Sequence, residues 1–197
     1  MTADFRILLI DNYDSYTYNL YHYFRQITDS DVVVMRYDSL QKNSPEHFSH
    51  IVISPGPGLP EEYPLIGEYL HTYGHEKYFL GICLGLQCMT SAFGGSLKNL
   101  QHVLHGITSQ VKILGAFPEY EGLSRQITVG HYHSWVADEK NLPDLFQITS
   151  VNENGLIMSI RNKSGTLCGI QFHPESVMTP DGLRILSNWW KSTLISA

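Results

Sequence analysis

The sequence predicts an α/β fold: an open, mostly parallel sheet flanked by helices, with an additional antiparallel β portion in the second half. In the first half, short continuous apolar runs alternate with helix-like segments, a pattern typical of buried parallel strands in βαβ units. In the second half, strand-like pieces follow one another across short polar turns, which favours antiparallel pairing. With 43% hydrophobic and 16% charged residues among 197, the composition is that of a globular protein.

The first half supplies the parallel part of the sheet. The apolar run at residues 5–10 ends in Asp11-Asn12 and predicts a buried strand, and Ser15 is available as the N-cap of a helix over residues 16–27. Further strands are expected at residues 31–36, 51–53 and 78–82, and further helices at residues 63–73 and 84–93.

The second half is expected to extend the sheet with antiparallel strands. These strands are expected at residues 110–114, 126–129, 146–151, 156–161 and 167–172. An amphipathic helix over residues 181–194, which carries Trp189 and Trp190, follows them. Because no internal repeat, low-complexity tract or linker interrupts the sequence, a single domain over residues 1–197 is expected.

Bulk properties argue against several classes of protein. The net charge of −6 and the lack of a Lys/Arg cluster disfavour a nucleic-acid partner. No apolar run approaches the roughly 20 residues of a membrane span, and residues 1–6 lack the basic region of a signal peptide. Cys83, Cys88 and Cys168 have no metal-type spacing and suit a reducing cytosol, so a cytoplasmic location is expected, with Cys88 and Cys168 in the core.

Cys83 is the most informative residue of the sequence. It lies between Gly81 and Gly85, where a predicted strand passes directly into a predicted helix. This is the cysteine form of a nucleophile elbow, a tight turn with no room for side chains at the flanking positions. The helix N-terminus favours the reactive thiolate. An unreactive, buried cysteine is the alternative interpretation.

A cysteine nucleophile requires a base, and the base requires an orienting partner. His173 and Glu175 can fill these roles because residues i and i+2 of an extended segment point to the same side. A solvated pair at the start of a loop is the alternative for these two residues.

A cysteine that attacks a carbonyl carbon in an acyl transfer also requires N–H donors, which hold the negatively charged oxygen that forms. The N–H of Leu84, directly after the nucleophile, is expected to be one donor. The loop at residues 54–60 can supply the second, because Gly56 and Gly58 allow a close approach of the backbone. A structural turn is the alternative, whereas the prolines of this loop remove amide donors and disfavour a phosphate site.

Five motifs then follow one another along the sequence. They are residues 11–20, residues 54–58, Gly81-x-Cys83-x-Gly85-x-Gln87, Tyr132-His133-Ser134 and His173-x-Glu175. Together they resemble the class I (triad) glutamine amidotransferases, and in particular the glutaminase subunits of anthranilate synthase and aminodeoxychorismate synthase. The resemblance covers nearly the whole sequence and implies a flavodoxin-like fold.

The resemblance implies that the protein hydrolyses L-glutamine through a thioester on Cys83, with His173 as base, Glu175 as its orienter, and Gly56 and Leu84 as oxyanion donors. The glutamine-binding residues that it implies are Gly56, Pro57, Gly58, Gln87, Ser134 and Trp135. Ammonia would pass to a partner synthase subunit that aminates chorismate. No cofactor and no metal is expected in this chain, whereas the partner synthase is expected to use Mg²⁺.

The resemblance also identifies a partner-facing surface and two departures from the family pattern. Residues 14–18 and 102–108 are expected to face the synthase. Leu86 stands where the family usually has His, so its role is open. His131 stands where this branch commonly has Arg, so any salt bridge at this position is in question. His131 and His133 share one strand face, but no further ligands with metal-type spacing accompany them.

Other functions stay open at this point. A glutaminase subunit that serves another acceptor, such as carbamoyl phosphate or a nucleotide, is one alternative. A stand-alone γ-glutamyl cysteine hydrolase is another, whereas the intact Cys83, His173 and Glu175 disfavour a catalytically silent scaffold. The sequence does not separate anthranilate from aminodeoxychorismate synthesis.

Overall fold

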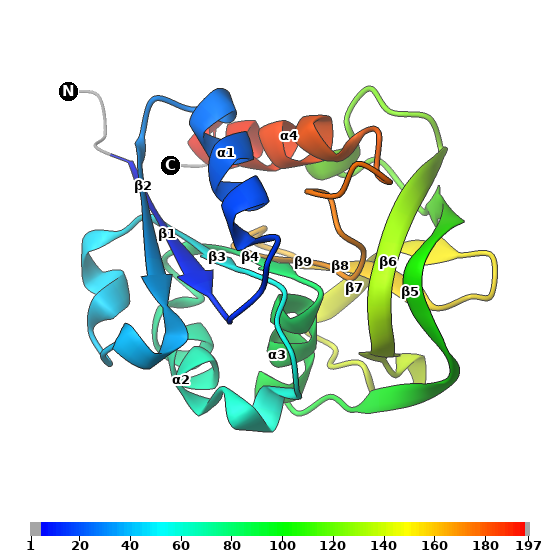
Figure 1. Cartoon of the computed structure of the whole chain (residues 1–197), viewed down its shortest axis with the longest axis horizontal. Coiled ribbons are helices and arrows are strands. Elements are labelled where there is room, and N and C mark those ends of the chain that lie inside the picture. Colours follow the sequence, from blue (N-terminus) through cyan, green and yellow to red (C-terminus); the bar gives the residue numbers. More distant parts are fainter. Residues whose placement is uncertain (1–4, 196–197) are drawn as a thin grey trace.

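One mixed sheet runs through the computed structural model, which describes residues 5–195 (Figure 1). Its strands are β1 (Arg6–Asp11), β2 (Asp31–Arg36), β3 (His50–Ile53), β4 (Tyr78–Ile82), β5 (Leu97–Ile113), β6 (Gln126–Ala137), β7 (Phe146–Asn152), β8 (Ile157–Asn162) and β9 (Leu167–Ile170). They lie in the order β2-β1-β3-β4-β9-β8-β7-β5-β6, parallel from β2 to β9 and antiparallel beyond β9. The predicted α/β fold, with its antiparallel portion in the second half, is confirmed.

Helices cover both faces of the parallel part. In Figure 1, α1 (Thr17–Ile27) and α4 (Gly182–Ile195) lie on one face, and α2 (Pro64–Tyr73) and α3 (Leu84–Ala92) lie on the other. Strand β1 serves both layers: Ile7 and Leu9 pack with α1 and α4, whereas Leu8 and Ile10 pack with α2 and α3. Because successive side chains of a strand point to opposite faces, a strand covered on both sides must be apolar throughout.

The carboxyl ends of β1, β3, β4 and β9 meet at one end of the sheet, where ligands bind in folds of this kind. The ends of β1 and β3 are tied together: the Asn12 N–H donates to the Ser54 hydroxyl at 3.0 Å, and the Asn12 amide donates to the Ser54 carbonyl at 3.0 Å. Strand β4 leads into Cys83, and β9 is followed by His173.

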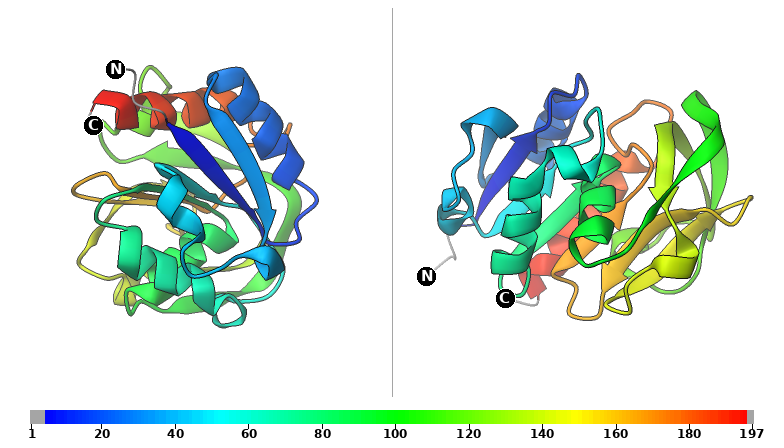
Figure 2. Two further views of the ribbon diagram at one scale, coloured as in Figure 1. Left: turned by 90° about the vertical axis from the view of Figure 1, so that its left-hand side faces the viewer. Right: turned by 90° about the horizontal axis from the view of Figure 1, so that it is seen from below.

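The long β5–β6 ribbon runs steeply across the other strands at one side of the molecule (Figures 1 and 2). It brings β6 beside the segment that follows β9, where the His173 N–H donates to the Gly130 carbonyl at 3.1 Å. Both strands are longer than predicted, since the sequence indicated only residues 110–114 and 126–129. The ribbon therefore forms a wall of the site, and it carries Ser134 and Trp135, two of the predicted glutamine-binding residues.

The predicted N-cap of α1 is wrong. The cap position is Tyr16, not Ser15, and no side chain caps it. Instead, the Asp14 carboxylate accepts the Tyr16 N–H at 2.8 Å, and the Asp11 carboxylate accepts the Thr17 hydroxyl at 3.0 Å. Asp14 of the preceding loop and Asp11 at the end of β1 thus hold the start of the helix in place of a cap from the adjacent serine.

Two further predictions concern export and membranes. The prediction that residues 1–6 lack a signal-peptide pattern falls mostly on residues 1–4, which lie outside the described residues. Within residues 5–195, none of the helices combines the length and the apolarity that crossing a membrane requires.

Candidate active site

Cys83 occupies a strained turn between β4 and α3. Its φ of 51° and ψ of −101° lie in a region that side-chain-bearing residues rarely adopt. A Cβ atom at Gly81 would lie 2.4 Å from the Gly85 carbonyl carbon, and one at Gly85 would lie 2.7 Å from the Ile53 carbonyl oxygen. Since both contacts are with backbone, the turn requires glycine on each side of Cys83.

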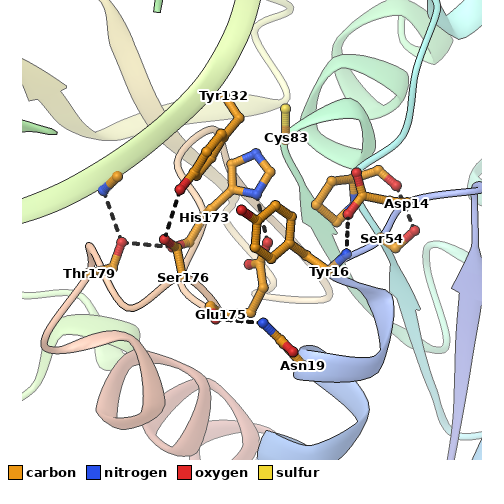
Figure 3. Close-up of polar contacts among 12 residues, drawn as sticks. Asp14, Tyr16, Asn19, Ser54, Cys83, Tyr132, His173, Glu175, Ser176 and Thr179 are labelled. Atoms are coloured by element: carbon orange, nitrogen blue, oxygen red, sulfur yellow. Dashed lines mark hydrogen bonds and ion pairs between the residues drawn. The ribbon is translucent and has the colours of Figure 1, made fainter. Parts of the chain in front are cut away.

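His173 and Glu175 form a buried hydrogen-bonded pair beside Cys83 (Figure 3). The distance from His173 Nδ1 to Glu175 Oε1 is 2.6 Å, and each residue is 2% exposed. With Nδ1 turned to the carboxylate, Nε2 is left for the thiol. Burial opposes a charge on this ring, but the interactions with the neighbouring Cys83 and with Glu175 outweigh it. The pKa of His173 therefore lies well above its ordinary value.

Several elements hold His173 in place. Its N–H is bound to β6, and its carbonyl accepts the Thr179 hydroxyl at 2.7 Å. The rings of Tyr16 and Tyr132 pack edge-on against the imidazole, with centroids 5.9 and 5.0 Å away. The hydrogen bond with Tyr132 raises the pKa of Tyr16 to about 12, so this ring stays a neutral phenol at physiological pH.

The loop after β3 lies against the start of α3. A Cβ atom at Gly56 would lie 2.7 Å from the Asn12 carbonyl oxygen and 2.8 Å from the Leu84 side chain, so only glycine allows this approach. Leu84 begins α3, and the N–H groups of a first helical turn have no acceptor within the helix. The two segments predicted to supply oxyanion donors are therefore neighbours, and both adjoin Cys83.

Two adjoining cavities border Cys83. The first, of about 230 Å³, is lined by every residue predicted to bind glutamine: Gly56, Pro57, Gly58, Gln87, Ser134 and Trp135. The second, of about 510 Å³, is lined in part by Asp14, Tyr16 and His173. The tertiary structure thus gathers the predicted site residues around one thiol, with Glu175 behind His173 and Leu84 at the helix start.

Gln171 also adjoins Cys83, although it is not among the residues predicted from the sequence. Its side chain is fully buried, with the amide nitrogen 3.5 Å from the Cys83 sulfur and the amide oxygen 3.3 Å from the Gln87 nitrogen. A signal was present in the sequence. Gln171 precedes His173 by two residues, and in an extended segment the two side chains share a face.

His131 and His133 form a second buried pair on β6. His131 Nδ1 lies 3.1 Å from His133 Nε2, and His131 Nε2 lies 2.7 Å from the Ser109 hydroxyl. Burial lowers the pKa of His131 to about 4 and that of His133 to about 3. His131 is therefore neutral, and hydrogen bonds take the place of a salt bridge. Residues 5–195 contain no group of three or more His, Cys, Asp or Glu side chains arranged to hold a metal ion.

Leu86 is a core residue of α3. It is fully buried and packs over Gly169 of β9, where an added Cβ would lie 3.0 Å from the Leu86 Cγ. Its role is therefore to fill the helix–sheet interface behind the elbow. Cys88 and Cys168 are buried as predicted, and burial raises the pKa of both thiols, which keeps them unreactive.

The fold and the elbow with its histidine–carboxylate pair have the arrangement typical of α/β enzymes with a cysteine nucleophile. The chain belongs to the class I glutamine amidotransferase family, whose model matches residues 8–192. The family predicted from the sequence motifs is thereby confirmed.

Individual relatives and a solved structure agree with this family. The chain is 42% identical to the aminodeoxychorismate synthase component 2 of Serratia marcescens, over 93% of this chain and 98% of that protein. It is also 42% identical to the anthranilate synthase component 2 of Lactococcus lactis, over 93% and 92%. The fold resembles that of a glutamine amidotransferase from Thermotoga maritima, with a TM-score of 0.74 at 20% identity over 98% of this chain and 83% of that one.

Proposed function

We propose that this protein is the glutaminase subunit of a chorismate-aminating synthase, built as one domain over residues 1–197 and acting in the cytoplasm. It hydrolyses L-glutamine and delivers ammonia to a partner subunit that makes anthranilate or 4-amino-4-deoxychorismate. The proposal rests on Cys83 at the elbow beside the His173–Glu175 pair, in a member of the class I glutamine amidotransferase family. Equal identity to components of both synthases favours neither product.

In the first step, Cys83 attacks the side-chain amide carbon of glutamine. The raised pKa of His173 supports an ion pair in which the thiol proton rests on Nε2. As the C–S bond forms, the amide oxygen becomes negative and is held by the N–H groups of Gly56 and Leu84. Glu175 stabilises the charged imidazole through its bond to Nδ1.

The tetrahedral intermediate then collapses and the C–N bond breaks. His173 gives its proton to the leaving nitrogen, so ammonia departs and a γ-glutamyl thioester remains. The neutral His173 next takes a proton from water, whose oxygen attacks the thioester carbon. Breakage of the C–S bond releases glutamate and restores the thiolate beside a protonated His173.

Glutamine is assigned to the cavity of about 230 Å³. The Gln87 amide nitrogen donates to the Trp135 carbonyl at 2.9 Å and to the Gln171 oxygen at 3.3 Å. Both of its hydrogens are used, so Gln87 offers the substrate only an acceptor, which suits an ammonium or an amide N–H. Ser134 and the loop at residues 56–58 line the cavity and add hydroxyl and backbone groups.

The synthase subunit is assigned to the surface around the second cavity. Tyr13 lines this cavity and Val103 lines the adjoining one, and they are 44% and 64% exposed. Tyr18, Ile107 and Val177 are further exposed apolar or aromatic side chains of the neighbouring segments. Residues 13–16 and His105 line the cavity itself. Ammonia released at Cys83 would leave toward this surface.

Substitution of Cys83 by alanine in the complex with the synthase subunit tests the proposal. Glutamine-dependent amination of chorismate is expected to be lost, whereas amination with added ammonium persists, because only the glutaminase step requires the thiol. His173→Ala is expected to behave in the same way. If glutamine still supports amination in the Cys83→Ala complex, the assigned nucleophile is wrong.

A further inference from the structure

The buried amide of Gln171 lies beside the Cys83 sulfur, and the mechanism above does not use it. Gln171 is fully buried, and its N–H donates to the Met158 carbonyl at 2.8 Å, which fixes the backbone next to β8. Its side-chain nitrogen lies 3.5 Å from Cys83 Sγ, within the range of an N–H···S hydrogen bond.

The direction of this hydrogen bond follows from a chain of contacts that begins at a backbone carbonyl. The Trp135 carbonyl can only accept, so the Gln87 nitrogen must face it, at 2.9 Å. The second hydrogen of that nitrogen points to Gln171, whose oxygen must then face Gln87, at 3.3 Å. The nitrogen of Gln171 is left for the sulfur, so the assignment of its amide is fixed by the network.

We propose that Gln171 is a further catalytic residue, which donates a hydrogen bond to the Cys83 thiolate, and that Gln87 orients it for this task. The inference deepens the proposed function and rests on Cys83 being the nucleophile. One continuous network then joins the backbone of Trp135, which lines the glutamine cavity, to the reacting sulfur.

The chemistry of the thiolate explains why a donor is useful here. A hydrogen bond to a charged acceptor is roughly twice as strong as one between neutral groups, so Gln171 favours the thiolate over the thiol. It also restricts the rotation of the sulfur, which must point at the amide carbon of the substrate. Once the thioester forms, the sulfur is neutral and the hydrogen bond weakens, so the donor acts mainly before the attack.

Two near-isosteric substitutions separate donation from packing. Gln171→Met keeps the length of the side chain and removes the donor. Gln171→Glu still accepts from Gln87 but places a carboxylate beside the sulfur. The measurement is the rate of alkylation of Cys83 by iodoacetamide from pH 5 to pH 10 in the full chain, with the modified cysteine identified by peptide mass spectrometry.

We expect the midpoint of the alkylation profile to move to higher pH by about one unit in Gln171→Met, which corresponds to a tenfold change in the thiol–thiolate equilibrium. A larger move is expected in Gln171→Glu, because like charges repel. Glutaminase kcat is expected to fall about tenfold in Gln171→Met, while the KM for glutamine in Gln171→Glu changes little, because Gln87 keeps its partner. Neither substitution removes any of the other titratable groups around the site, which are His173, Glu175, His133, Tyr132, Cys88 and Asp14.

The matched control is Gln147→Leu, on an exposed position of β7, which is expected to leave the alkylation profile unaltered. An unshifted profile in both Gln171 variants, with native circular dichroism and thermal unfolding, overturns the inference. Such a result would leave the proposed function intact as long as Cys83→Ala lacks glutaminase activity. If Cys83→Ala retains that activity, the nucleophile itself is misassigned.

Discussion

At the scale of the residue, the turn around Cys83 depends on two glycines, which carry no Cβ atom. The positive φ of Cys83 is tolerated because β4 and α3 approach each other through two glycines. Such strain is typical of functional sites, where surrounding packing maintains a conformation that the residue itself disfavours. The identity of Gly81 and Gly85 is therefore as much a requirement of the site as Cys83 is.

Gly81→Ala is expected to destabilise the fold by about 1–3 kcal/mol, because its Cβ would lie 2.4 Å from backbone that cannot move aside. The measurement is the free energy of unfolding from a urea titration. Gly67→Ala in α2 is the matched control, since its Cβ would meet nothing closer than 4.0 Å. This variant is expected to be stabilised by about 0.5–1 kcal/mol, because alanine favours a helix interior. Equal stability of the two variants would contradict the steric account of the elbow.

At the scale of the element, the β5–β6 ribbon differs most from its prediction. Strand β5 pairs with β7 only over its last residues, Val111 to Ile113, and with β6 along most of its length. Much of β5 is therefore exposed, and residues 101–110 lack the apolar alternation that reveals a half-buried strand. The sequence predicted only the end of β5 that enters the core, and in β6 it missed residues 130–137, although Val136 and Ala137 are buried.

The exposed apolar residues of β5 lead to a prediction about assembly. Val103→Asp and Ile107→Asp are each expected to weaken binding of the synthase subunit about tenfold or more, because a charge would have to be buried in an apolar contact. Affinity is measured by titration calorimetry, and glutaminase activity of the isolated chain is measured alongside. Leu145→Asp is the control, since Leu145 is also 40% exposed. It lies just before β7, near the C-terminal end of α3, whereas Cys83 lies at the N-terminal end of that helix. Unchanged affinity in both β5 variants would place the partner elsewhere.

At the scale of the whole molecule, buried neutral histidines couple the stability of the fold to pH. His50, the first residue of β3, is fully buried against α4. Its Nδ1 lies 2.8 Å from the Ser49 hydroxyl, and its Nε2 lies 2.7 Å from the Thr193 hydroxyl. Burial lowers its pKa from 6.5 to about 3, and the pKa values of His131 and His133 are lowered as well. The unfolded chain therefore binds more protons than the folded one in mildly acidic solution.

The sign of the effect follows directly. Stability from a neutral histidine is fully present above pH 6.5 and is lost as the pH falls toward the folded pKa. His50→Gln, which retains hydrogen-bonding capacity, is expected to reduce the loss of unfolding free energy between pH 6 and pH 4 by roughly 1.4 kcal/mol per pH unit. Urea titrations across this range provide the measurement. The exposed His75→Gln is the control, and an equally steep pH dependence in His50→Gln would show that His50 is not the group that titrates.

The sequence by itself determined the order of the elements and which local motifs carry the candidate catalytic residues. Continuous apolar runs are required wherever a strand is covered on both faces, so the parallel strands were recognisable from local pattern alone. The elbow was also recognisable from local pattern, since its strand, glycines, cysteine and helix are contiguous in the sequence. His173 and Glu175 could be paired because an extended backbone puts alternate residues on one side.

Only the tertiary structure decided which distant residues share the site and what holds them. Gln171 meets Cys83 from 88 positions away, and Gln87 meets Gln171 from 84. The neutral state of His131 depends on burial by a ribbon whose pattern is too polar to predict. Local sequence encodes the direction of each side chain relative to its own backbone, whereas the partner it meets is set by how the strands and helices pack, a property of the whole chain.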